Sequence, residues 1–263
     1  MLIGKDFDKI EISLFGFDLV EPNAFIGDSI ILIVALLLAS KTKKLSDSSQ
    51  FFENWRYFYL LFGIDMFLGG IGHLMFKYWG FNGKYLPWIL GIFCVFFVER
   101  AMISLLKSST KVIWKNLSLF KLVLALLLKL RVLKVMQELI WKNLSLFKLV
   151  LALLLELGVF YAIDMSKDHS IGLRIPAINS AIGFVFSLAI LGNKYREEID
   201  KNFVFMIYGV LLLIPSGLFI SFKINLHPWF DKNDFGHLLL IVAMFLYFKA
   251  IKSYSKIVEN KDQ

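Results

Sequence analysis

Two histidines and three aspartates lie inside or at the edge of apolar stretches, where their side chains could support metal or acid–base chemistry. His73 follows the glycine-rich run FLGGIG, and Asp65 lies eight residues before it. Asp234 and His237 open the last apolar stretch at a spacing that places them on one helix face. Asp28 lies early in the first apolar stretch. Imidazole nitrogens and carboxylate oxygens are both ligands that zinc accepts in a tetrahedral site.

Most of these residues also have a plainer interpretation. Asp234 could cap a helix at the level of the lipid headgroups. His73 could hydrogen-bond across a tight, glycine-lined helix contact. Asp28 could be a solvated acid in a first helical turn. Asp65 lies deeper, where a charge costs roughly 2.5–3.5 kcal/mol on insertion scales, so such a residue usually faces the interior of a helix bundle.

The elements that must position these residues are membrane spans. Apolar residues make up 58% of the chain and the mean hydropathy is +0.68, more than a soluble domain needs. The apolar runs are continuous rather than alternating, which predicts an all-α, polytopic transmembrane helical bundle. Seven spans are expected, at 23–40, 54–76, 86–106, 144–163, 171–191, 203–222 and 233–251. The chain, 1–263, is then a single integral membrane domain.

Basic residues orient the predicted bundle. The connections on one side carry 20 lysines and arginines and those on the other side carry 8, with Lys148 left inside a span. Cytoplasmic loops hold the excess of basic residues in membrane proteins. We therefore expect the N-terminal segment, 1–22, outside the cell membrane and the tail, 252–263, in the cytoplasm. The net charge of +8 belongs to these loops rather than to a nucleic-acid surface.

This orientation brings four of the polar residues to one depth near the outer surface. We expect an outward-facing polar pocket in which His73, Asp234 and His237 are metal ligands. A zinc ion there would lower the pKa of a bound water to about 7, and an adjacent carboxylate would take its proton. Asp28 and Asp65 are the candidates for that base.

An internal repeat interrupts the pattern of spans. The segment IWKNLSLFKLVLALLL occurs at 113–128 and again at 140–155, and its identity indicates a recent duplication or an engineered feature rather than an architectural repeat. The apolar part of the first copy, 117–128, rises only about 18 Å, too short to cross a bilayer. We expect a basic interfacial helix over 113–139 on the cytoplasmic leaflet; the alternative is a long, straight extension of the fourth span.

Three short motifs carry a family resemblance. EPNAFIGDS, FLGGIGHL and FDKNDFGHLL resemble a group of uncharacterised bacterial seven-helix membrane proteins. More remotely, the chain is similar to the alkaline ceramidase and progestin/adiponectin receptor superfamily of metal-dependent membrane hydrolases. That similarity implies zinc held by His73 and His237. The chain departs from the superfamily pattern at Gly69, where a serine is expected, and at Asn233, where the first histidine of an HxxxH pair is expected.

Two hypotheses of different class follow. The first is a metal-dependent hydrolase that acts on lipid amides or esters, with the bilayer as its environment and a lipid as its substrate. The second is a non-enzymatic membrane protein, structural, sensing or transporting, whose polar cluster bridges helices or binds a ligand. The sequence leaves the substrate and the oligomeric state open.

Overall fold

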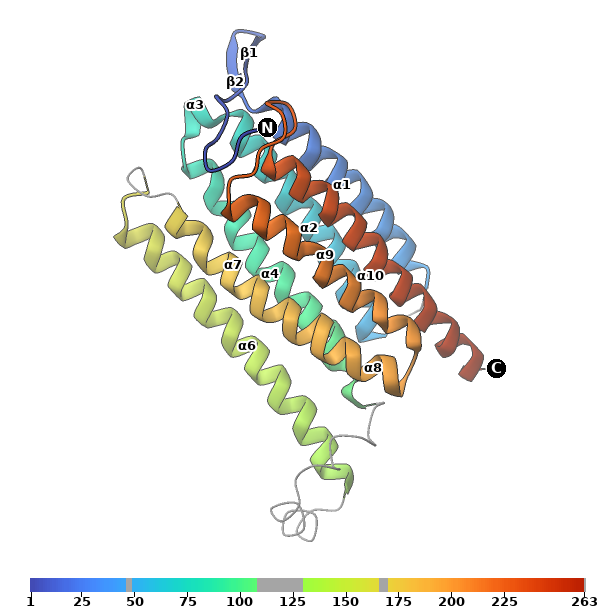
Figure 1. The fold of residues 1–263 in the computed structure, drawn as a ribbon. Helices are drawn as coiled ribbons and strands as arrows, with labels where there is room; N and C mark the ends of the chain where they lie inside the picture. The colour runs from blue at the N-terminus through green and yellow to red at the C-terminus, as the bar shows by residue number, and fades with distance from the viewer. Residues whose placement is uncertain (46–48, 108–129, 166–169, 263) are drawn as a thin grey trace.

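The computed structural model describes residues 1–45, 49–107, 130–165 and 170–262, which form a bundle of long helices with a small hairpin at one end (Figure 1). Its elements are β1 (Glu11–Leu14), β2 (Phe17–Val20), α1 (Pro22–Lys43), α2 (Gln50–Leu74), α3 (Phe76–Trp79), α4 (Asn82–Ser104), η1 (Leu105–Lys107), α6 (Leu130–Ala162), α7 (Ser170–Phe184), η3 (Val185–Leu191), α8 (Gly192–Glu198), η4 (Lys201–Phe203), α9 (Val204–Ser221) and α10 (Lys232–Asp262).

Seven helical segments are long and apolar enough to cross a membrane. The fifth joins α7, the π-helical η3 and α8 into one rod, 171–198, and the fourth lies within α6. The predicted all-α bundle with seven spans is therefore confirmed. Most helices run beyond the expected bounds because polar turns at their ends continue the helix outside the apolar core.

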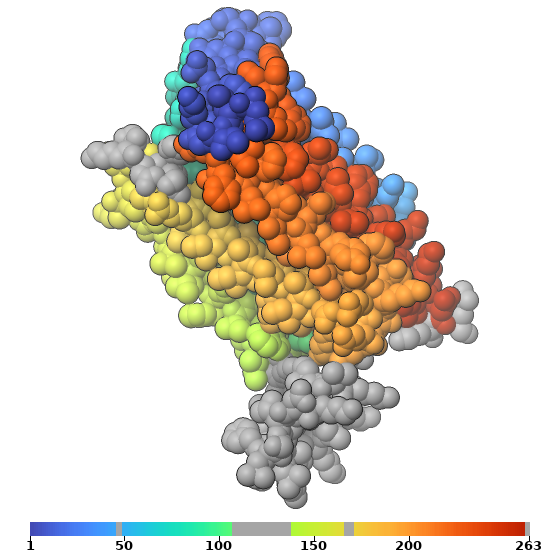
Figure 2. Space-filling view, in the orientation of Figure 1, coloured from blue at the N-terminus to red at the C-terminus, as the bar shows by residue number. Residues whose placement is uncertain are grey.

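Helix α2 packs against both α1 and α4, and α10 closes the bundle by packing against both α9 and α1. Helix α6 lies on one flank, against α4 and α7 (Figure 1). The N-terminal segment, the hairpin and the loop between α9 and α10 cover one end of the bundle, as the blue and orange surfaces at the top of Figure 2 show. We call this end the hairpin end. The C-terminus lies at the other end (Figure 1).

The two ends are packed differently. Large aromatic side chains fill the interior of the C-terminal end, and the most buried of them are Phe51, Trp55, Tyr59, Tyr195 and Phe203. They lie edge to face or tilted against their neighbours, an arrangement that fills space densely. No comparable cluster lies at the hairpin end of the described chain, where glycines and polar residues face the interior instead.

Glycines at the hairpin end allow two helices to touch backbone to backbone. A Cβ atom on Gly72 of α2 would lie 2.4 Å from the carbonyl oxygen of Gly83 in α4. No other residue fits there, since small residues are what lets membrane helices approach this closely. The run FLGGIG thus brings the start of α4 against the end of α2, next to His73.

A buried ion pair attaches α6 to the bundle. The Lys148 ammonium lies 2.7 Å from Glu99 Oε1 of α4 and donates to Asn179 Oδ1 of α7 at 2.8 Å. The Ser145 hydroxyl donates to the other Glu99 oxygen at 2.7 Å. Every charged atom of this cluster has a partner, so we regard it as a structural connection between three helices.

The duplicated insert is described only in part. Residues 130–139 form the beginning of α6 and continue into the fourth span as one helix, as in the alternative interpretation of that segment. Residues 113–129 lie beyond the described part of the chain, so the interfacial helix stays a prediction for them.

The repeat offers a matched pair of mutations. Lys148→Met leaves Glu99 buried without its cation, which should lower the free energy of unfolding by about 3–5 kcal/mol. Lys121→Met changes the identical sequence of the first copy and is expected to cost less than about 0.5 kcal/mol. Thermal unfolding in detergent measures both. Equal losses would mean that the ion pair is not what holds α6.

Candidate functional site

Two adjoining cavities hollow the hairpin end. The first, of about 710 Å³, lies under the N-terminal segment and the α9–α10 loop, and we call it the vestibule. The second, of about 350 Å³, lies deeper between α1, α2, α4, α7 and α10, and we call it the inner cavity. Their walls share His73, Lys84, Trp88 and Leu173, so these four side chains lie at the boundary between the two.

His73 is paired in the vestibule. Its Nδ1 lies 2.7 Å from Glu21 Oε2, and the Lys9 ammonium lies 3.1 Å from the same oxygen. Burial alone would raise the pKa of the Glu21 carboxyl, but the hydrogen bond with His73 and the charge of Lys9 outweigh it and lower that pKa to about 2. An ionised carboxylate only accepts, so Nδ1 is the donor and Nε2 of His73 is left for another partner.

Asp28 of α1 faces His237 of α10. Asp28 Oδ1 lies 3.4 Å from His237 Nε2, which is close enough for an ion pair. This oxygen accepts no hydrogen bond from any described residue. A Cβ on Gly70 would lie 2.9 Å from the Asp28 Cβ, so the glycine is what admits Asp28 between α1 and α2. Asp28 is 3% exposed.

Asp65 and Lys84 line the inner cavity without a close polar contact to the protein. Neither side chain makes a hydrogen bond or an ion pair with any described residue. Asp65 is buried, with Oδ2 3.4 Å from the position of a Cβ on Gly91, and Cys94 lines the same wall one turn further along α4. Asp28, Asp65 and Lys84 therefore all line the inner cavity, with Lys84 at its boundary with the vestibule.

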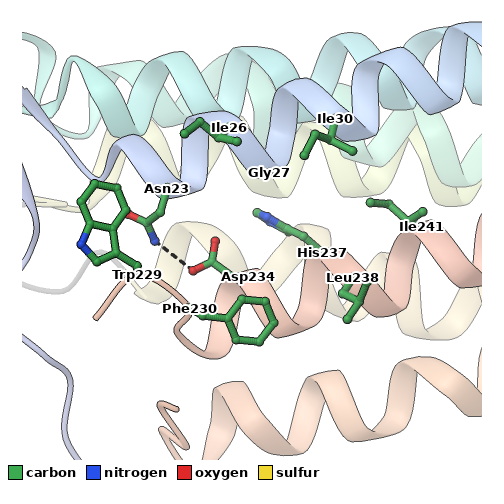
Figure 3. A pocket seen from close by; sticks show the side chains of 10 residues that line it. All are labelled: Asn23, Ile26, Gly27, Ile30, Trp229, Phe230, Asp234, His237, Leu238 and Ile241. Carbon is green, nitrogen blue, oxygen red and sulfur yellow. Dashed lines mark hydrogen bonds between the residues drawn. The ribbon is translucent and has the colours of Figure 1, made fainter. Parts of the chain in front are cut away.

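Asp234 has a structural role at the start of α10. Asp231 Oδ1 accepts from the backbone N–H groups of Asn233 and Asp234, and Asp234 Oδ2 accepts from the N–H of Asp231. These reciprocal bonds form a capping box. Asn23 of α1 also donates to Asp234 Oδ2 at 2.9 Å, as the dashed line in Figure 3 shows.

Asp234 lies in a third space, apart from the inner cavity. A groove of about 300 Å³ runs between α1 and α10, with Ile26 and Ile30 on one side and Leu238 and Ile241 on the other (Figure 3). The His237 ring stands between this groove and the inner cavity, since it lines both.

The structure brings together some of the expected site residues. Asp28, Asp65, His73 and His237 line one cavity, whereas Asp234 does not. Across the described residues, no group of three or more histidine, cysteine, aspartate or glutamate side chains lies close enough to hold a metal ion. The three expected zinc ligands do not form a ready ligand set as placed here, and zinc binding stays a prediction.

Two residues of the site were not singled out from the sequence. By sequence Lys84 belongs to a basic connection between two predicted spans, yet it lies in the first turn of α4 and lines the inner cavity. By sequence Glu21 belongs to the N-terminal segment, 1–22. Its position directly before Pro22 was the available signal, because proline favours the first turn of a helix and places Glu21 at the helix start.

A model for a family of unknown function, DUF6962, matches residues 24–155 and 132–256. The chain belongs to this family. The two matched segments overlap between 132 and 155, within the part of the chain that holds the second copy of the repeat. No curated protein and no solved structure matches the chain.

The pairing of Glu21 predicts a pH effect on stability. Because the pKa in the folded protein is about 2 and the usual value is 4.5, ionised Glu21 stabilises the fold above pH 4.5, and this contribution is lost as the pH falls towards 2. It amounts to roughly 3 kcal/mol. Glu21→Gln should therefore flatten the loss of stability between about pH 5 and about pH 3.

Unfolding temperatures measured across this pH range provide the comparison. Glu11→Gln is the control, because Glu11 pairs with Lys77 on the exposed hairpin. Its pH curve should run parallel to that of the unmodified protein. A Glu21→Gln curve that is also parallel would show that the contact with His73 contributes little.

Proposed function

We propose that this integral membrane protein binds a small polar solute in the inner cavity, as a sensor or carrier does. One observation supports this most: the cavity is lined by ionisable side chains of both signs, Asp65 and Lys84, that make no hydrogen bond or ion pair with a described residue. A charge without a partner inside a membrane protein is expensive. Such groups are retained where a ligand or water completes their interactions.

The contrast with Glu99 and Lys148 strengthens the argument. Those two residues lie in the same bundle and pair at 2.7 Å, with further hydrogen bonds to their remaining atoms. The fold can therefore pair intramembrane charges where a structural contact is needed. At the hairpin end the charges face a cavity instead.

The vestibule provides the route of entry. It is rich in charged residues, and the residues on its wall include Asp6, Lys9, Glu21, Lys223, Asp231 and Lys232. A hydrated, charged entrance suits a polar solute that arrives from water rather than from lipid. With the orientation expected from the basic residues, that water is the outer solution.

Cys94 reports on the cavity because it is the one cysteine in the chain and lines the inner cavity. A small cationic methanethiosulfonate should react with it in the folded protein. Gly91→Leu places a larger side chain beside Asp65 and should slow the reaction at least tenfold. Gly158→Leu on α6 is the control, because a Cβ there meets no atom within 4 Å. Cys94 that reacts only after denaturation would contradict a solvent-accessible cavity.

A second candidate is the metal-dependent hydrolase implied by the resemblance. The observation that favours it is the contact of Asp28 with His237 in the cavity that His73 also lines. In such an enzyme the metal would supply an activated water. The described side chains do not form a three-ligand set, so we derive no reaction step from them.

Metal analysis of protein purified without a polyhistidine tag tests this candidate. A hydrolase of this kind should carry stoichiometric zinc, and His73→Ala and His237→Ala should each lose it. His227→Ala, in the exposed α9–α10 loop, should keep it. Unmodified protein that holds no zinc and takes up none on titration rejects the hydrolase and leaves solute binding standing.

A further inference from the structure

We infer that the solute is zwitterionic, with a carboxylate that binds at Lys84 and an ammonium group that binds at Asp28 and Asp65. This inference rests on the proposed function, since it names the class of solute that the inner cavity takes. It follows from the order in which the charged residues occur along the depth of that cavity.

Helix α4 gives the depth of each group. Lys84 lies in its first turn. Pro87 follows one turn later, where Gly69 of α2 has both Pro87 and the Asp28 carboxylate as its nearest neighbours. Gly91 comes one turn after that and faces the Asp65 carboxylate. At about 1.5 Å per residue, the Lys84 backbone lies about 4–5 Å above the level of Asp28 and about 10 Å above that of Asp65.

Lys84 is suited to the carboxylate end of the solute. It lies at the boundary between the vestibule and the inner cavity, and its ammonium makes no hydrogen bond or ion pair with a described residue. His73 lines the same wall as Lys84. Because its Nδ1 pairs with Glu21, its Nε2 remains available for the solute. A solute carboxylate at this position would pair with the Lys84 ammonium without breaking an existing hydrogen bond or ion pair of that lysine.

Asp65 and Asp28 are suited to the ammonium end. Asp65 makes no bond to a described residue, and Asp28 Oδ1 has only the long contact with His237. An ammonium group has three donors, enough to reach both carboxylates. Gly91 leaves the space beside Asp65 Oδ2 that such a group would occupy.

A solute with a single charge fits this arrangement less well. An amine alone leaves the Lys84 ammonium unpaired, and a carboxylate alone leaves both aspartates unpaired and lies near them. Buried groups left without partners reduce affinity strongly, which is how polar sites reject close analogues. A zwitterion pairs groups at both depths at once.

The test uses the full chain in nanodiscs and a panel of small solutes. The zwitterions are glycine, β-alanine and γ-aminobutyrate, which differ in charge separation. Propylamine, propionate and propionamide carry one charge or none. Binding is measured as protection of Cys94 from the methanethiosulfonate and as a concentration-dependent rise in unfolding temperature. At least one zwitterion should bind tenfold or more tightly than each of the other three.

Two variants separate the ends of the site. Lys84→Met should weaken binding of the best zwitterion at least tenfold and should not weaken the binding of propylamine. Asp65→Asn should weaken the same zwitterion and should not weaken the binding of propionate. Lys77→Met and Asp18→Asn are the controls, since Lys77 of α3 pairs with Asp18 of the hairpin and neither residue lines the cavity. Neither control should change binding.

Each remaining result counts against the inference. Propylamine that binds as well as the zwitterions shows a cation site, and propionamide that binds best shows a neutral one; either overturns the zwitterion and keeps the proposed function. If no solute of the panel binds while Cys94 still reacts in the folded protein, the zwitterion is overturned and the cavity is not. If Cys94 is also unreactive, both fail.

Discussion

The arrangement of this protein depends on how two pairs of ionisable side chains inside the bundle are satisfied. Hydrocarbon offers no hydrogen bonds, so an intramembrane charge needs either a protein partner or access to water or a ligand. The chain uses both solutions at different depths. Glu99 and Lys148 complete one another further from the hairpin end, whereas Asp65 and Lys84 line a cavity near that end.

Helix packing determines where an ionisable side chain can face a cavity instead of a protein partner. Aromatic side chains fill the C-terminal end and leave little space between the helices there. At the hairpin end the α2–α4 contact is made by Gly72 and Gly83, and Gly70 and Gly91 stand beside Asp28 and Asp65. Glycines bring the backbones together and contribute no side-chain volume. Polar groups can then lie between the helices with room for a small molecule.

Continuous apolar runs were enough to predict the helical class and the number of spans, because the length of a membrane helix is limited by the thickness of the bilayer. The polar positions were also visible in the sequence, since Asp28, Asp65, His73 and His237 stand out against apolar neighbours. Their partners were not. The pairing of His73 with Glu21 joins residues 52 positions apart and depends on how the N-terminal segment folds over the bundle. Shared depth placed Asp234 with the others, but depth does not give the direction of a side chain, and Asp234 turns towards its own helix start.

We propose that Asp65 is kept for a ligand and not for the fold. A group of that kind gives the unliganded protein no stability, so its neutral isostere should be at least as stable. The decisive measurement is the unfolding temperature of Asp65→Asn without added solute, next to that of Glu99→Gln. We expect Asp65→Asn to unfold at the same or a higher temperature than the unmodified protein, and Glu99→Gln to unfold at a clearly lower one. A loss for Asp65→Asn as large as that for Glu99→Gln would instead show that Asp65 is a structural residue.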